Sequence, residues 1–179
     1  MMEGNQSEPP VSSPKLSVAE AFAGYRGGKE MPLASYATLL GIYNTAFAAL
    51  LLAANNSKRE LPERVGYADL LLLGVATFEL SRIIAKDRVT SPLRAPFTEY
   101  VEAAGASEVK EKVRGEGMQR AVGDLVTCPY CLSPWVAAGL VFGLVFRPRA
   151  TRLVMGTFAA AAISGLLHHA SDANKEEKE

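Results

Sequence analysis

The sequence contains very few of the residues that build metal centres and disulfide scaffolds, with two cysteines and two histidines among 179 residues. Two cysteines are too few for the disulfide framework of a small secreted domain and for a zinc site made of cysteines alone. Lys and Arg together number 19, as do Asp and Glu, so the formal net charge is zero. Because the chain lacks the basic excess typical of nucleic-acid-binding proteins, nucleic acid is not an expected partner.

Charged residues are absent from three long stretches, residues 33–54, 125–146 and 153–167. At ~1.5 Å per helical residue, the first of these stretches suffices to cross a hydrocarbon core of about 30 Å. A further apolar segment covers residues 65–85. We therefore expect an all-α fold, an integral membrane bundle of four helices. The helices are predicted at residues 33–54, 65–85, 125–146 and 153–169.

The rest of the chain is polar and is expected to lie outside the membrane. We expect residues 1–32 to form a disordered tail with one short helix, and residues 170–179 to form a charged tail. Residues 86–124 are expected to form a polar loop between the second and third helices, with a surface helix at 107–113. Lys and Arg are more frequent on the side that would hold both termini and this loop. That excess predicts that the termini and the loop are cytoplasmic.

Three charged side chains stand inside the apolar segment 65–85, namely Asp69, Glu79 and Arg82. A charge at the centre of a bilayer costs about 2.5–3.5 kcal/mol on insertion scales, so these side chains are expected to face protein or water. Glu79 and Arg82 are three residues apart on one helix face, which predicts an ion pair, with Asp69 near an interface. The alternative interpretation is a polar site or proton path.

A basic group follows this segment at Lys86, Arg88 and Arg94. Beside a membrane helix, such residues bind anionic lipid headgroups or form a solvated face that sets the topology. Both interpretations place the three side chains at the surface.

Small residues recur at four-residue steps in the apolar segments and predict close helix packing. The glycines among them are Gly41, Gly139, Gly143 and Gly156. Gly139 and Gly143 have the GxxxG spacing, and we expect them to face the fourth helix.

Both cysteines lie in the stretch Thr127–Trp135, which reads TCPYCLSPW. Pro134 suits the first position of a helix with Ser133 as its cap. We therefore expect residues 128–132 to be non-helical and covered by protein or water, with the thiols just below the membrane interface.

Three interpretations of Cys128 and Cys131 remain open. His168 and His169 lie at a depth similar to that of Cys131 if the last two helices are antiparallel, so the four side chains are a candidate zinc site. A CxxC pair at a helix N-terminus is also typical of thiol–disulfide exchange, because that position lowers the pKa of a thiol. The third interpretation is structural, with small buried thiols packed beneath Trp135.

The sequence from about residue 36 to residue 167 resembles an uncharacterised bacterial family of small multi-pass membrane proteins, some of which are labelled sporulation proteins. The resemblance is carried by Arg82, 86–88 (KDR), 91–97 (SPLRAPF), 123–125 (GDL) and the CPYC sequence followed by Trp135. It implies a bacterial source and brings no established activity, cofactor or partner.

We therefore expect a non-catalytic protein of the bacterial inner (cytoplasmic) membrane, in contact with the lipid bilayer. It would assemble with itself or with another membrane protein and carry a metal or redox site at Cys128 and Cys131. The alternative function is that of a membrane thiol–disulfide oxidoreductase that uses the same two cysteines.

Overall fold

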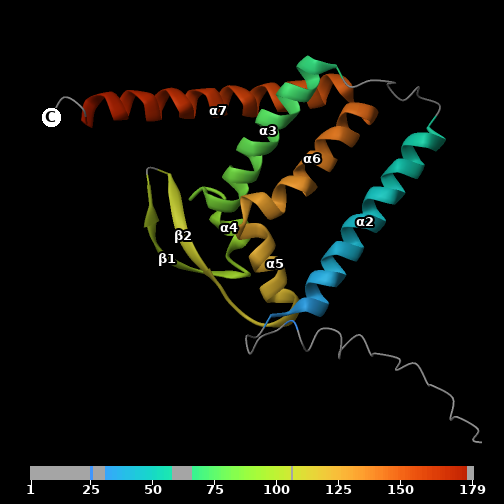
Figure 1. Cartoon of the computed structure of the whole chain (residues 1–179), viewed down its shortest axis with the longest axis horizontal. Coiled ribbons are helices and arrows are strands. Elements are labelled where there is room, and N and C mark those ends of the chain that lie inside the picture. Colours follow the sequence, from blue (N-terminus) through green and yellow to red (C-terminus); the bar gives the residue numbers. More distant parts are fainter. Residues whose placement is uncertain (1–24, 26–30, 58–65, 106, 177–179) are drawn as a thin grey trace, which may run out of the picture.

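The computed structural model describes residue 25 and residues 31–57, 66–105 and 107–176. Figure 1 shows long helices joined through a smaller group of elements between α3 and α6. The long helices are α2 (Leu33–Asn56), α3 (Tyr67–Lys86), α6 (Pro129–Phe146) and α7 (Pro148–Glu176). The smaller elements are α4 (Ser91–Arg94), β1 (Thr98–Ala104), β2 (Glu108–Val113) and α5 (Gly117–Thr127).

The long helices lie where the charge-poor segments predicted them, although some ends differ. The predicted fourth helix, 153–169, is part of the much longer α7. It begins earlier because Pro148 suits the first position of a helix, and the Thr151 N–H already donates to the Arg147 carbonyl over 3.0 Å. The predicted tail at 1–32 falls almost entirely outside the described residues.

Among the described helices, three are long and apolar enough to cross a membrane: Leu33–Asn56, Pro129–Phe146 and Pro148–Ala173. Helix α3 does not join them, because Asp69, Glu79 and Arg82 interrupt its apolar sequence. The composition is thus compatible with membrane association.

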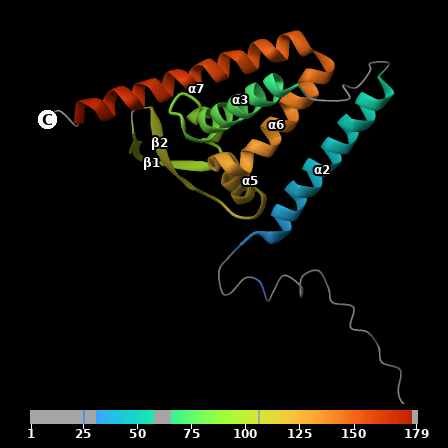
Figure 2. The same ribbon diagram turned by 45° about the horizontal axis from the view of Figure 1, so that its top comes forward.

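The predicted arrangement as a simple four-helix bundle is not what the helices form. Helix α3 packs against both α6 and α7, and the buried centre of this contact contains Leu73, Ala76, Leu140 and Met155. Helices α6 and α7 diverge from the turn that joins them, as Figures 1 and 2 both show. Helix α2 stands apart from this core and contacts α5 and α6. The core is therefore built around α3.

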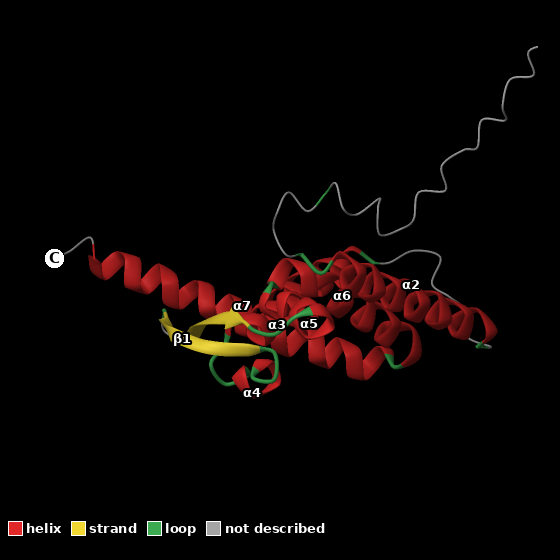
Figure 3. Cartoon of the chain, turned by 90° about the horizontal axis from the view of Figure 1, so that it is seen from below, coloured by secondary structure: helices red, strands yellow, loops and turns green. Residues whose placement is uncertain are grey.

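The all-α prediction is wrong for the segment between α3 and α6, where β1 and β2 form an antiparallel two-stranded sheet. The surface helix predicted at 107–113 is strand β2. Its sequence EVKEKV turns Val109 inward and Lys110 outward, a two-residue alternation typical of a half-buried strand. Gly105 has a φ of +71°, which favours glycine, directly after β1. Figure 3 shows the sheet beside α4 and far from α2.

A buried arginine joins this sheet to the end of α3. Arg94, in α4, is 0% exposed and donates to both carboxylate oxygens of Glu111 in β2, over 2.6 and 3.3 Å. It also donates to the carbonyls of Ile84 and Asp87 over 2.6 and 2.9 Å. The prediction that Arg94 lies at the surface is therefore wrong, because its donors satisfy the end of α3 and a buried carboxylate.

Candidate functional site

The cysteine pair occupies the junction between α5 and α6. Cys128 ends α5 and is the N-cap of α6, with extended backbone (φ −107°, ψ 104°), and Pro129 takes the first helical turn. The Cys131 N–H donates to the Cys128 Sγ over 3.2 Å, so this sulfur is the N-cap acceptor of α6. The sequence therefore starts the helix at Pro129.

The predicted helix start at Pro134 is wrong, and so is the non-helical conformation predicted for residues 129–132, whereas Cys128 is indeed non-helical. Pro134 lies inside α6, where it has no N–H to donate to the Tyr130 carbonyl. The Ser133 hydroxyl donates to that carbonyl instead, over 3.0 Å. This replacement satisfies the carbonyl and lets the helix continue through the proline.

The two sulfurs are bonded to each other. Cys128 and Cys131 form a disulfide, with their Cα atoms 5.2 Å apart. Cys128 is half-buried, whereas Cys131 is exposed. The pair is thus an oxidised CxxC whose second residue is exposed.

A cavity of about 620 Å³ lies between α2, α5 and α6, with Cys131 on its wall. We call it the α2 cavity. Most of its wall is apolar, and Tyr36 and Asp124 form its polar end, where the Tyr36 hydroxyl donates to Asp124 Oδ2 over 2.6 Å. Its remaining lining residues are Met31, Leu39, Leu40, Tyr43, Ala121, Leu125, Pro134 and Trp135.

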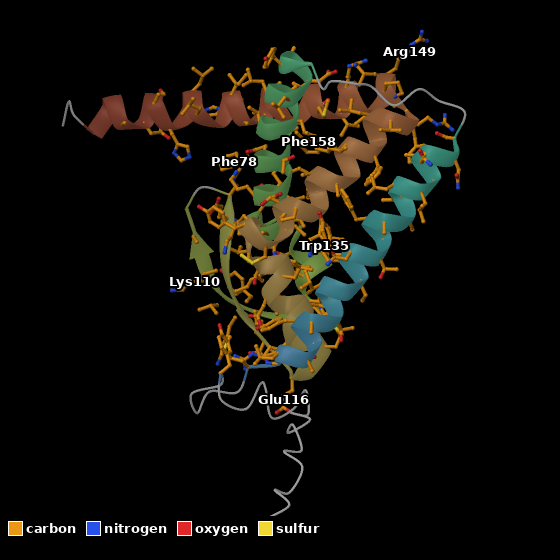
Figure 4. All side chains as sticks on the ribbon, turned by 45° about the vertical axis from the view of Figure 1, so that its right-hand side comes forward. Phe78, Lys110, Glu116, Trp135, Arg149 and Phe158 are labelled. Atoms are coloured by element: carbon orange, nitrogen blue, oxygen red, sulfur yellow. A yellow bond between two sulfur atoms is a disulfide. The ribbon has the colours of Figure 1, made fainter. Side chains whose placement is uncertain are left out.

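Aromatic rings bridge α2 and α6 beside this cavity. Tyr43 meets Trp135 edge to face with ring centroids 5.0 Å apart, and Phe47 meets Phe142 in the same way at 5.3 Å. Such pairs contribute about 0.5–1.5 kcal/mol each beyond the area they bury. Figure 4 shows Trp135 between the two helices. The rings hold α2 at a fixed distance from the cysteine end of α6.

A second, smaller cavity of about 130 Å³ lies where α3 faces the first turn of α6. Its wall includes Pro129 and Tyr130, the two residues between the cysteines, together with Arg82. The disulfide thus lies between two hollows, one toward α2 and one toward α3.

The described residues bring no group of three or more His, Cys, Asp or Glu side chains together in a geometry that would hold a metal ion. The proposed convergence of His168 and His169 with the cysteines is not found. Its premise, an antiparallel pair of helices, is wrong because α6 and α7 diverge (Figure 1). Both histidines are exposed on α7, and both sulfurs are in the disulfide.

The predicted ion pair on α3 is confirmed. Arg82 donates to both carboxylate oxygens of the buried Glu79, over 2.8 and 3.1 Å. It also donates to Glu108 of β2 over 3.0 Å, a partner that the sequence did not indicate. Asp69 lies at the other end of α3 and accepts two hydrogen bonds from Arg152 of α7, over 2.8 and 2.9 Å. These polar residues therefore join α3 to its neighbours.

Of the predicted basic surface, Arg88 is exposed and Lys86 is half-buried.

The predicted close packing at glycines is found at one of the four positions. A Cβ added at Gly143 would come within 2.7 Å of Thr151, so Gly143 does face α7. Cβ atoms added at Gly41, Gly139 and Gly156 would meet nothing within 4 Å among the described residues. Among these four glycines, Gly143 is the one whose contacts with described residues support the predicted packing.

Sequence reasoning missed Tyr36 and Asp124 as parts of the site. Asp124 lies four residues before Cys128, one turn earlier on the same side of the chain, and this spacing is the signal that was available. Tyr36 comes from a helix that is 88 residues away in sequence. Nothing in the local pattern indicates that contact.

Comparison with known proteins assigns this architecture to a family. The family model described as "Protein of unknown function (DUF1360)" matches residues 72–171, a segment that contains both cysteines. Sporulation protein YjcA of Bacillus subtilis (strain 168) is 30% identical over 101 residues, which cover 55% of this chain and 86% of that protein. No solved structure matches the chain. The expected resemblance is confirmed, and the chain belongs to the DUF1360 family.

Proposed function

We propose that this chain is a membrane protein that carries out thiol–disulfide exchange at Cys128 and Cys131. The observation that supports the proposal is a disulfide at the N-terminus of the long helix α6, with Cys131 an exposed residue. Helix N-termini stabilise negative charge, so they favour release of a thiolate. The sequence suggested a non-catalytic protein first and a thiol–disulfide oxidoreductase as the alternative. The position of the disulfide at the start of α6 favours the oxidoreductase.

The environment of each cysteine supports one order for the reaction. A partner thiolate attacks Cys131 Sγ, the S–S bond breaks, and Cys128 leaves as a thiolate that accepts the Cys131 N–H. A second partner thiolate then attacks the mixed disulfide and releases Cys131. The partner's two thiols become one disulfide, and the chain gains the two electrons and two protons as a dithiol.

Two single substitutions, Cys128→Ser and Cys131→Ser, test this order, and each variant is the control for the other. Purified protein in detergent is mixed with a small peptide, which is in its dithiol form for the wild type and in its oxidised (disulfide) form for the variants, and mixed disulfides are trapped by acid and counted by mass spectrometry. Cys128→Ser leaves the accessible Cys131 thiol and is expected to trap much more adduct from an oxidised peptide than Cys131→Ser. Equal trapping by both variants would contradict the assigned order, and wild-type protein that never exchanges with the peptide would contradict the function.

A second candidate function is assembly into oligomers, and the open glycines favour it. Gly139 is exposed on α6, and a Cβ there meets nothing within 4 Å among the described residues. A small residue exposed on an apolar helix lets a helix of another chain approach closely. Gly139→Leu is expected to shift the oligomer distribution in detergent, measured by light scattering, whereas Val141→Leu on the same helix is not. An unchanged distribution for Gly139→Leu would remove this candidate.

We also propose an inner-membrane location with the cysteine end and the β1–β2 sheet on the cytoplasmic side. The excess of Lys and Arg on that side supports it. Cytoplasmic disulfides in mesophiles are usually transient and either catalytic or redox-sensing, which agrees with exchange at this pair. Glu102→Cys in a protein with both native cysteines replaced by Ser is expected to react with a membrane-impermeant maleimide only after cells are opened. Labelling of intact cells would contradict this orientation and place the sheet on the outer side of the membrane.

A further inference from the structure

We propose that the α2 cavity binds a lipid-soluble quinone, which accepts the electrons that Cys128 and Cys131 collect during exchange. This inference rests on the proposed exchange function and names the carrier that restores the disulfide. Each exchange leaves a dithiol, so a further two-electron acceptor has to reach the sulfurs. Cys131 is one of the residues that line the α2 cavity, so a molecule inside that cavity would contact this residue.

The walls of the cavity select a lipid-soluble carrier over a water-soluble one. Asp124 is the one charged residue among the described residues that line it, and this half-buried carboxylate repels the phosphates of nucleotides and the carboxylates of glutathione. Helices α2 and α6 flank the cavity, and both are long and apolar enough to cross a membrane. A carrier dissolved in the lipid can therefore enter between them.

Size and ring contacts favour a flat head group. The cavity volume of about 620 Å³ lies within the range of about 300–1,000 Å³ that is typical of small-molecule sites. Tyr43 and Trp135 line it and contact each other edge to face, so each ring is fixed by the other. Aromatic side chains held in this way stack well on a planar ring.

The polar end supplies a route for protons to a quinone oxygen. The Tyr36 hydroxyl donates to Asp124 over 2.6 Å, so Asp124 can accept a proton released by a thiol while the Tyr36 hydroxyl gives one to the quinone. Both residues share the cavity with Cys131. One cavity thus holds an electron donor, a ring-binding wall and a proton-transfer pair.

The reaction balances without another reagent. In the dithiol form, two S–H bonds break and one S–S bond forms between Cys128 and Cys131. The two electrons and two protons pass to the quinone, where two O–H bonds form and give a quinol. The sulfurs are oxidised, the quinone is reduced, and the quinol leaves into the lipid.

The experiment uses the full chain, reduced with a dithiol, freed of the reagent and placed in detergent with a fully substituted short-chain benzoquinone. A fully substituted ring resists addition of thiols, so loss of quinone absorbance reports reduction to the quinol. Alkylation of the remaining thiols counts the dithiol that is oxidised, and one quinone per chain is expected. Leu39→Trp fills the cavity, and Leu51→Trp places the same side chain on α2 at an exposed position outside it.

We expect Leu39→Trp to slow quinone reduction at least tenfold, with Leu51→Trp unchanged and exchange with a small dithiol peptide unchanged in both. Equal quinone reduction by both variants and wild type would overturn the cavity as the site. Exchange with the peptide but no oxidation by quinone would overturn the quinone and leave the exchange function standing. Absence of both reactions in wild-type protein would overturn the exchange function and this inference together.

Discussion

Replacement of Arg94 by Met is expected to produce a large loss of stability in the described part of the chain. The guanidinium is 0% exposed and its side-chain nitrogens donate to Glu111, to two carbonyls at the end of α3, and to two hydroxyls. Met has a similar volume, so the change removes hydrogen bonds and leaves Glu111 buried without its cation. Breaking a buried ion pair from one side costs about 3–5 kcal/mol.

The assay is denaturant unfolding of the purified protein in a mild detergent, followed by circular dichroism, with Glu111→Leu alone and together with Arg94→Met. Because the single changes each leave a buried partner unsatisfied, the double variant is expected to be more stable than either. Lys110→Met is the control. Lys110 and Glu102 are both exposed, and although the hydrogen bond lowers the pKa of Glu102, water screens the pair, so no measurable change is expected.

A loss below about 1 kcal/mol for Arg94→Met would refute the reasoning, because the pair of Arg94 and Glu111 would then contribute no more than an exposed ion pair does. So would a double variant whose loss equals the sum of the two single losses. Either result would mean that Arg94 does not hold β2 against α3.

The remaining predictions concern close contacts of glycine and one ion pair. Gly123→Ala would bring a Cβ within 2.5 Å of Val113, so it is expected to loosen α5 from β2 and to cost about 1–3 kcal/mol in the same unfolding assay. Gly143→Ala, which would meet Thr151 at 2.7 Å, is expected to cost a similar amount. Gly139→Ala is the matched control for both; with open space at its Cβ it should keep the stability or raise it by up to about 1 kcal/mol, and a loss as large as that of Gly143→Ala would contradict the assigned packing. Removal of the Asp69 carboxylate by Asn is expected to have a small effect that high salt abolishes, because the pair with α7 is exposed.

The positions of the long helices were predictable from the sequence, because bilayer-crossing segments exclude charge over a fixed length. The ion pair of Glu79 and Arg82 was predictable for a similar reason, since a helix places residues three apart on one face. In each of these cases the governing interaction is local.

The errors arose where distant residues decide the structure. Residues 107–113 contain a pair four residues apart that suits a helix, and the choice of strand depends on β1 and on the burial of Glu111 against Arg94. Pro134 predicts a helix start because it has no N–H to donate. In the structure the helix continues through it, since the Ser133 hydroxyl donates to the Tyr130 carbonyl. The site was predicted only in part: the cysteine pair follows from spacing, whereas the contact between Tyr36 and Asp124 depends on how α2 packs.

The redox state of Cys128 and Cys131 in native membranes tests the central proposal most directly. Cells are exposed briefly to a membrane-permeant dithiol, the dithiol is removed, and free thiols are trapped at intervals with an alkylating reagent that changes the mass of the chain. The account predicts a disulfide before exposure, two free thiols during it, and return of the disulfide afterwards. A pair that stays in one state throughout would contradict it.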